Sequence, residues 1–163
     1  MSLPLKPPLV PQLAKSRKTL PEGDEWVYEP KYDGFRALAF VDRGGDEDYV
    51  YLQSRGGKPL ARYFPELGFP DGRYVLDGEL VILDEQGEEV FDALQSRIHP
   101  ADSRIKLLAE EIPVIYRTFD LLARGDETLI GRPFSERRAA LVELLSGFDG
   151  ASKDGPGGWR VGS

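Results

Sequence analysis

The chain has 163 residues, 40% of them hydrophobic, a formal net charge of −7, no cysteine and a single histidine. This length is enough for one domain with a hydrophobic core. The composition excludes disulfides, zinc–thiolate sites, cysteine nucleophiles and sites that need two histidines. No apolar run approaches the ~20 residues of a membrane span. The N-terminus has no secretory apolar core, so we expect a cytoplasmic protein with no membrane partner.

The first half of the chain is predicted to form strands joined by short turns. Residues 1–24 are rich in Pro, Lys and Arg, and we expect them to wrap the surface. Residues 25–42 read as strand, turn, strand, because aromatic and β-branched residues flank a Pro/Asp/Gly break. The elements expected next are a strand over 49–53, a turn over 54–57, a short helix over 62–67 and a strand over 74–77. Gly78 interrupts the apolar run, which continues over 79–83.

The second half adds helices and one strongly apolar strand. Helices are predicted over 92–98 and 103–111, and a buried strand over 113–122. Ser135 is a plausible N-cap of a helix that ends at Gly147, and residues from 149 on read as a linker. Arg132, Arg137 and Arg138 are predicted to lie on the solvated face of that helix. The pattern predicts an α+β fold of mainly antiparallel sheets with short helices.

Lys31 stands in the strongest motif of the sequence. Glu29, Lys31 and Asp33 alternate, so in an extended chain their side chains share one face. Gly34 lets a ligand approach the backbone, which suits a lysine nucleophile. A neutral amine is the attacking species, so the pKa of Lys31 must fall from about 10.4, as a nearby cation such as Arg36 or a metal ion would cause. The alternative interpretation is a surface Lys–Asp pair beside a turn.

Further motifs follow in order along the chain. Together they resemble the covalent nucleotidyltransferase superfamily, and most closely the bacterial ATP-dependent DNA ligases. The resemblance extends from about Pro8 to Leu145. Its motifs are EPKYDGFR at 29–36, SRGG at 54–57, LDGEL at 76–80, FDALQSR at 91–97, TFDLL at 118–122, and GRP at 131–133 leading into ERR at 136–138.

The resemblance implies a ligase nucleotidyltransferase (ATP-grasp-like) fold that is incomplete at its C-terminus. Residues 25–148 would be a partial adenylation domain, and 149–163 a linker or truncated tail. A Glu-Gly-x-x-x-Lys element and a Lys-x-Lys strand, which the family pattern places later, have no match after Leu145. The family pattern also has an oligonucleotide-binding domain after these elements, and we expect this domain and the missing C-terminal part to be partners of the chain. We therefore expect the isolated chain to be slow or inactive in self-adenylation and not to seal nicks.

The resemblance also implies a reaction and a set of roles. Lys31 would attack the α-phosphate of ATP and form a covalent lysyl-AMP, with Mg²⁺ or Mn²⁺ as the metal cofactor. The DNA partner would be nicked or broken double-stranded DNA in repair, recombination or replication. Glu29 would lie by adenine, Arg36 by the ribose and phosphate, Arg55 by the nucleotide sugar or the DNA 5′-phosphate, Glu79 by the ribose or the metal, and Phe119 against the base, while Asp33, Gly34 and Asp77 would support the site.

Several alternatives stay open. An RNA ligase or an mRNA-capping guanylyltransferase shares the lysine motif, and a non-catalytic remnant could bind nucleotide or a protein partner. Phe119 could be an ordinary core residue, and Arg55 a solvated residue of a Gly-rich turn. Glu79 could merely end or kink a strand beside Gly78, and Asp77 could form a turn.

Overall fold

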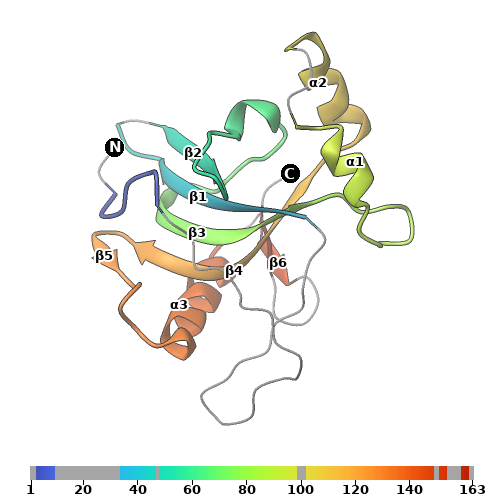
Figure 1. Ribbon diagram of the computed structural model, residues 1–163. Helices are drawn as coiled ribbons and strands as arrows, with labels where there is room; N and C mark the ends of the chain where they lie inside the picture. Colours follow the sequence, from blue (N-terminus) through green and yellow to red (C-terminus); the bar gives the residue numbers. More distant parts are fainter. Residues whose placement is uncertain are drawn as a thin grey trace.

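One antiparallel sheet organises the chain (Figure 1). This computed structural model describes residues 3–9, 34–46, 48–98, 102–148, 151–153 and 159–161. The strand order is β2-β1-β3-β4-β7-β6, and β5 pairs with β4 outside this path. The strands are β1 (Phe35–Arg43), β2 (Tyr49–Ser54), β3 (Gly72–Val81), β4 (Ile115–Arg124), β5 (Glu127–Thr128), β6 (Ala151–Lys153) and β7 (Trp159–Val161). The expected α+β fold with mainly antiparallel pairing is confirmed.

Short helices occupy the ends and one side of the sheet. The 3-10 helix η1 (Ala61–Tyr63) follows β2, and α1 (Phe91–Gln95) and α2 (Asp102–Glu111) lie together beyond one end of the sheet (Figure 1). Helix α3 (Phe134–Ser146) packs beside β4 and buries Leu141 and Leu145. In the part of the chain that the structure describes, no helix has the length and apolar character needed to cross a bilayer.

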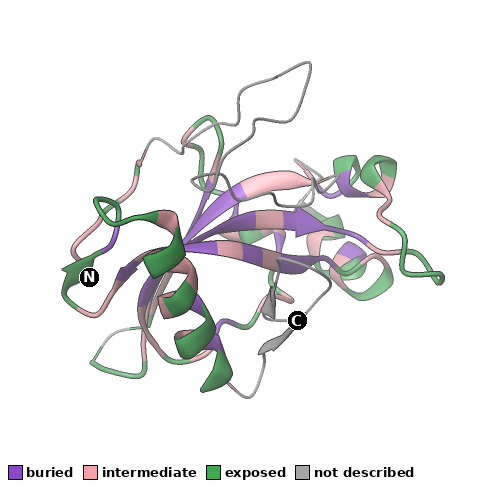
Figure 2. Cartoon of the chain, turned by 90° about the horizontal axis from the view of Figure 1, so that it is seen from below, coloured by how far each residue is buried: buried purple, intermediate pink, exposed green. Residues whose placement is uncertain are grey.

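The two faces of the sheet bury different apolar clusters. Much of the central strands is coloured as buried in Figure 2. Because side chains alternate along a strand, Ala37, Ala39 and Val41 of β1 face the larger cluster, which also contains Leu141 and Leu145 of α3. Leu38 and Phe40 face the smaller cluster together with Leu3. The N-terminal segment is tied down there, since the Gln53 side chain exchanges two hydrogen bonds with the backbone of Leu9, at 2.6 and 2.5 Å.

A buried ion pair joins the turn after α1 to the segment between η1 and β3. The Arg97 side chain is fully buried and pairs with Glu66 through two hydrogen bonds, of 2.6 and 3.0 Å. Its guanidinium also donates to the carbonyls of Tyr63 and Ile112, both at 2.7 Å. Glu66 in turn accepts from the Val114 amide at 2.9 Å. These contacts satisfy most of the polar atoms that the pair buries, as a buried charge requires.

Gly78 interrupts the apolar run of the sequence but not the strand. β3 runs unbroken from Gly72 to Val81, because β1 and β4 hydrogen-bond to it on both sides. A Cβ at Gly78 would overlap the Arg117 carbonyl oxygen and lie 2.9 Å from Cζ of Tyr116. The glycine is therefore a packing requirement of the strand rather than its end.

Three local predictions differ from the structure. The helix expected over 62–67 is reduced to the single turn of η1. Ser135 lies inside α3, whose N-cap position is Pro133 with no side-chain cap; proline suits a helix start because its missing N–H would have no intrahelical partner there. Part of the expected linker pairs with the sheet, since β6 and β7 add to the edge of β4.

Candidate functional site

Adjacent strands bring four of the predicted site residues together. Arg36 of β1 is the cross-strand partner of Glu79 of β3, and Asp77 lies two residues away on the same face. Phe119 of β4 approaches the same point, with Cζ of Arg36 lying 5.8 Å from the centre of its ring. The prediction that Arg36, Asp77, Glu79 and Phe119 belong to one site thus has a geometric basis in the strand register.

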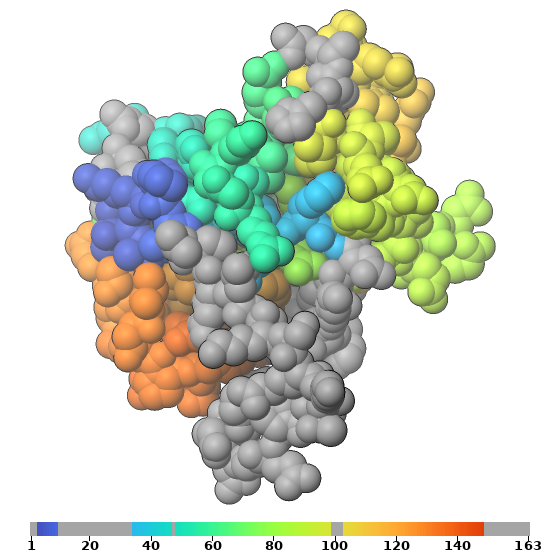
Figure 3. Space-filling view, viewed as in Figure 1, coloured from blue at the N-terminus to red at the C-terminus, as the bar shows by residue number. Residues whose placement is uncertain are grey.

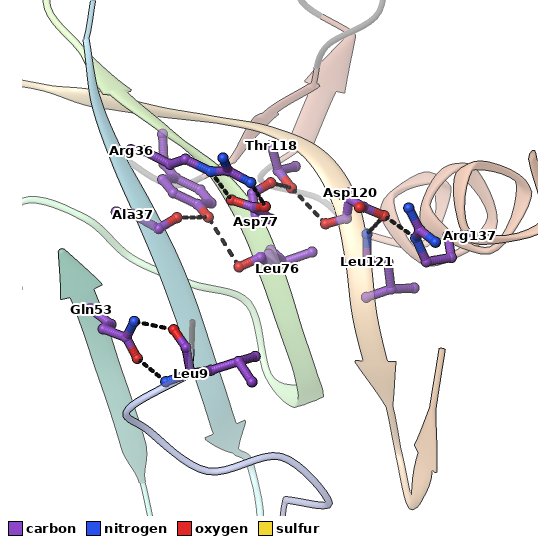
Figure 4. A network of polar contacts seen from close by, with 11 residues as sticks. Leu9, Arg36, Ala37, Gln53, Leu76, Asp77, Thr118, Asp120, Leu121 and Arg137 are labelled. Carbon is purple, nitrogen blue, oxygen red and sulfur yellow. Dashed lines mark hydrogen bonds and ion pairs between the residues drawn. The ribbon is translucent and has the colours of Figure 1, made fainter. Parts of the chain in front are cut away.

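Arg36 and Asp77 form a bidentate ion pair at the centre of this cluster (Figure 4). Nε of Arg36 donates to Oδ1 of Asp77 at 3.0 Å, and Nη2 donates to Oδ2 at 2.5 Å. The Asp77 side chain is 4% exposed and that of Arg36 is 18% exposed. Asp77 therefore fixes the plane of the guanidinium from the buried side, while part of Arg36 stays accessible to a ligand. Asp77 lies inside β3 and forms no turn.

Burial and pairing act in opposite directions on this pair. Burial lowers the pKa of Arg36, but the hydrogen bond and charge of Asp77 outweigh it and raise the pKa above its ordinary value. Burial raises the pKa of Asp77; Arg36 lowers it and the neighbouring Asp120 raises it. The guanidinium thus remains a fixed positive charge, as recognition of a phosphate or a ribose hydroxyl requires.

Glu79 is half-buried, and an arginine lies opposite it on each of the two neighbouring strands. Its partners in the sheet are Arg36 on β1 and Arg117 on β4. Arg117 is itself held by Glu89, with Nη1 at 2.5 Å from Oε1. Glu79 lies within β3 and does not end or kink the strand. Among the described residues, no group of three or more His, Asp or Glu side chains could hold a metal ion. Mg²⁺ in nucleotide sites uses one or two carboxylates and the substrate phosphates, so a single Glu79 fits that mode of binding.

Phe119 occupies a bulge in β4. The register pairs Asp77 with Asp120 and then Gly78 with Thr118, so Phe119 is an extra residue of β4 at this point; a second shift, between Val75 and Leu76, leaves Leu122 unpaired in the same way. A β-bulge bends its strand and re-aims a side chain. Phe119 is only half-buried and is absent from both apolar clusters, whereas Tyr116 and Leu121 of the same strand are core residues. The structure therefore argues against an ordinary core role for Phe119.

Arg55 is exposed and no described contact draws it into the cluster. It follows the last residue of β2, Ser54, which pairs with Ala37 beside Arg36. The turn is closed by the Gly57 amide, which donates to the Ser54 carbonyl at 2.9 Å. In Figure 3 the start of β1 reaches the surface between this segment and the one that holds α1. Arg55 thus lies at the same end of the sheet as Arg36.

Glu29, Lys31 and Asp33 lie outside the described residues. Their predicted roles stay predictions. Gly34 is described, and a Cβ there would overlap the Leu80 carbonyl oxygen and lie 2.6 Å from Cγ1 of Val81. Glycine is therefore required at position 34 by close packing against β3, which could not be predicted from the sequence.

Sequence reasoning missed a second pair behind the cluster. Asp120 Oδ1 accepts from Nε of Arg137 at 2.9 Å, and both side chains are nearly buried (Figure 4). The prediction of a solvated helix face is therefore wrong for Arg137. The sequence feature that could have predicted this pair is Asp120, because a carboxylate inside an apolar strand needs a charged or hydrogen-bonding partner.

Comparisons with known proteins show which family the chain resembles. The family model described as "ATP dependent DNA ligase domain" matches residues 7–154. DNA ligase C of Mycobacterium tuberculosis is 49% identical over 160 residues, which cover 94% of this chain and 42% of that protein. DNA ligase C1 of Mycolicibacterium smegmatis is 50% identical over 154 residues, covering 89% of this chain and 43% of that protein. A solved structure, "mycobacterial DNA ligase D complexed with ATP and MES", superposes with a TM-score of 0.58 at 31% identity, covering 72% of this chain and 36% of that one.

Proposed function

The chain belongs to the ATP-dependent DNA ligase family, and on this basis we propose that it carries part of the site in which a ligase takes AMP from ATP. It spans less than half the length of the curated relatives reported above. The activity of the whole enzyme is therefore part of the proposal. The observation that carries it is the Arg36–Asp77 pair, held at 2.5 and 3.0 Å with the Phe119 ring beside it.

Each described residue has a chemical task in this proposal. Arg36, fixed by Asp77, binds the ribose and the phosphate with its accessible donors. Phe119 offers its ring to the adenine base, since an aromatic face stacks on any purine. Glu79 binds the ribose or a metal ion. Mg²⁺, when bound with the nucleotide, neutralises charge on the phosphates.

Lys31 is the proposed nucleophile. Its neutral amine attacks the α-phosphorus of ATP, so that a P–N bond forms, the P–O bond to pyrophosphate breaks, and the amine loses its proton to solvent. The product is a covalent lysyl-AMP. Glu29 beside the adenine, Asp33 and Gly34 as supporting residues, and Arg55 at the nucleotide sugar or a DNA 5′-phosphate complete the proposed site.

The proposed DNA substrate is a nick or break in double-stranded DNA. The net charge of −7 does not oppose this, because phosphate binding depends on the residues that face the groove and not on the sum. We also propose that the enzyme is cytoplasmic. Its activity would need the further domains that the relatives contain outside the region matched by this chain.

Covalent labelling tests the proposal. Residues 1–163 are joined to the remaining length of the tuberculosis relative and incubated with α-labelled ATP and Mg²⁺. We expect label on the protein, and none after Lys31→Ala. Lys58→Ala, which changes an exposed lysine of the turn after β2, is the matched control and should keep the label. Equal labelling of the wild type and Lys31→Ala would contradict the proposed nucleophile.

Replacing ATP with GTP in the same experiment separates the alternatives. A DNA ligase takes label from ATP, whereas label from GTP alone would indicate a capping guanylyltransferase. Offering adenylated protein a nicked DNA or a nicked RNA duplex separates DNA ligation from RNA ligation. Saturable nucleotide binding with no adduct would favour a non-catalytic remnant.

A further inference from the structure

The position of the Phe119 ring depends on a β-bulge in β4. The hydrogen bonds between β3 and β4 do not by themselves hold the backbone of this bulge in place. Phe119 is one of two residues of β4 without a counterpart on β3, the other being Leu122, and it lies between the pairs Asp77–Asp120 and Gly78–Thr118. An extra residue leaves the local ladder disrupted. Something besides the ladder must therefore hold the backbone on either side of Phe119.

Side chains supply that support on both sides of Phe119 (Figure 4). Before it, the buried Thr118 hydroxyl donates to the Asp77 carbonyl at 3.0 Å. After it, Oδ1 of Asp120 accepts from the Leu121 amide and from Nε of Arg137, both at 2.9 Å. The bulge is thus fastened to β3 at one end and to α3 at the other.

Arg137 is well placed to act as a rigid anchor. Its Nη1 donates to the Arg132 carbonyl at 2.7 Å, and its Cζ lies 5.4 Å from the centre of the Phe134 ring. The side chains of Arg137 and Asp120 are 13% and 11% exposed. A charge-assisted hydrogen bond at this depth is stronger than one between exposed groups.

The same ion pair is not needed to attach α3 to the sheet. Leu141 and Leu145 of α3 are buried in the larger cluster, at 0% and 1% exposed. This apolar packing anchors the helix. The pair between Arg137 and Asp120 lies near the start of α3 and next to the bulge. Its main effect should therefore be on the position of Phe119, the residue before Asp120.

We propose that Arg137 is a positioning residue for the nucleotide base: by clamping Asp120 it holds the β4 bulge, and with it the Phe119 ring, in the orientation that receives adenine. This inference rests on the proposed function. Arg137 touches no substrate itself and acts only through Asp120 and Phe119.

Binding of two probes by the chain tests the proposal. ATP carries a base, and inorganic tripolyphosphate does not. We expect Arg137→Gln to weaken ATP binding several-fold and to leave tripolyphosphate binding unchanged, because the phosphate-binding Arg36 keeps its partner Asp77. Arg138→Gln removes the same charge from the next residue of α3 and should change neither affinity. Equal weakening of both probes would mean a general loss of structure and would overturn the proposal.

A double-mutant cycle checks the route through the ring. Phe119→Ala removes the group that Arg137 is proposed to position. In that background Arg137→Gln should have no further effect on ATP binding. An additional loss as large as in the wild type would show that Arg137 acts elsewhere.

A measurement without nucleotide separates this inference from the proposed function. In nuclear magnetic resonance spectra of the free chain, the Phe119 ring and the Arg36 side chain should give a cross-relaxation signal. Arg137→Gln should weaken this signal and Arg138→Gln should retain it, whether or not the chain binds ATP. An unchanged signal in a folded Arg137→Gln chain would overturn the positioning role and leave the proposed function intact.

Discussion

Single residues of the site are shaped by what lies behind them. Asp77 is almost completely buried, yet its two oxygens are both used by Arg36. A carboxylate buried without such a partner would cost several kcal/mol. The pair is therefore both a structural requirement of the sheet and the means by which a guanidinium is held in a fixed plane at the surface.

Phe119→Ala should weaken ATP binding by about 1–3 kcal/mol, because stacking of a base on an aromatic ring contributes about that much. Phe119→Tyr keeps the ring and should bind ATP nearly as well. Isothermal titration calorimetry of both variants measures the difference. Unchanged affinity in Phe119→Ala would remove this residue from the proposed site.

Tyr116 gives the protein a defined response to alkaline pH. Its hydroxyl donates to the Ala37 carbonyl at 2.7 Å, and complete burial raises the pKa of the phenol well above its ordinary value. The unfolded chain ionises this group near pH 10. The folded chain keeps the proton on Tyr116, so the free energy of unfolding decreases as the pH rises above about 10.

Tyr116→Phe should therefore make the alkaline stability curve less steep. At neutral pH the variant loses about 1 kcal/mol with the hydrogen bond. Above about pH 10 the wild type should lose about 1.4 kcal/mol per pH unit more than the variant. Urea unfolding between pH 8 and 11 measures both curves, and parallel curves would contradict the assignment.

At the scale of elements, the approach of β3 to β4 depends on the absence of a side chain. Gly78 faces the Arg117 carbonyl and the Tyr116 ring at distances that leave no room for a methyl group. β4 must come this close for its bulge to place Phe119 beside Arg36.

Gly78→Ala should destabilise the fold by about 3 kcal/mol, as overpacking of a rigid interior does. It should also weaken ATP binding in the fraction that folds. Gly68→Ala is the matched control, because a Cβ at Gly68 meets nothing within 4 Å. Thermal unfolding of the two variants makes the comparison, and equal melting temperatures would contradict the packing argument.

At the scale of the whole molecule, strands distant in sequence assemble one surface. β1, β3 and β4 lie side by side although long segments separate them along the chain. The larger cluster fastens α3 beneath the sheet, and the smaller one fastens residues 3–9 on the other face.

The polypeptide of residues 1–163 alone should form lysyl-AMP slowly or not at all, because the Glu-Gly-x-x-x-Lys and Lys-x-Lys elements of the family pattern have no match in it. Those lysines would neutralise charge on the α-phosphate. Labelled ATP, with Lys31→Ala as the reference, measures the yield. A stoichiometric adduct on this polypeptide would contradict the need for the later elements.

The sequence determined the fold class and the family, and it predicted the residues of the candidate site. Runs of apolar, aromatic and β-branched residues predicted the strands around Phe35–Arg43 and Ile115–Arg124, and ordered motifs singled out Arg36, Asp77, Glu79 and Phe119. Apolar runs and motif order are local properties, so they can be read along the chain.

Only the tertiary structure decided how those residues meet. The bulge at Phe119, the unbroken path of β3 through Gly78 and the burial of Arg137 against Asp120 all depend on pairing between segments far apart in the chain. Local propensity at Gly78 favours a break, and a run of charges at the start of α3 favours exposure. Hydrogen bonding across the sheet and the cost of leaving the buried Asp120 carboxylate unpaired outweighed both.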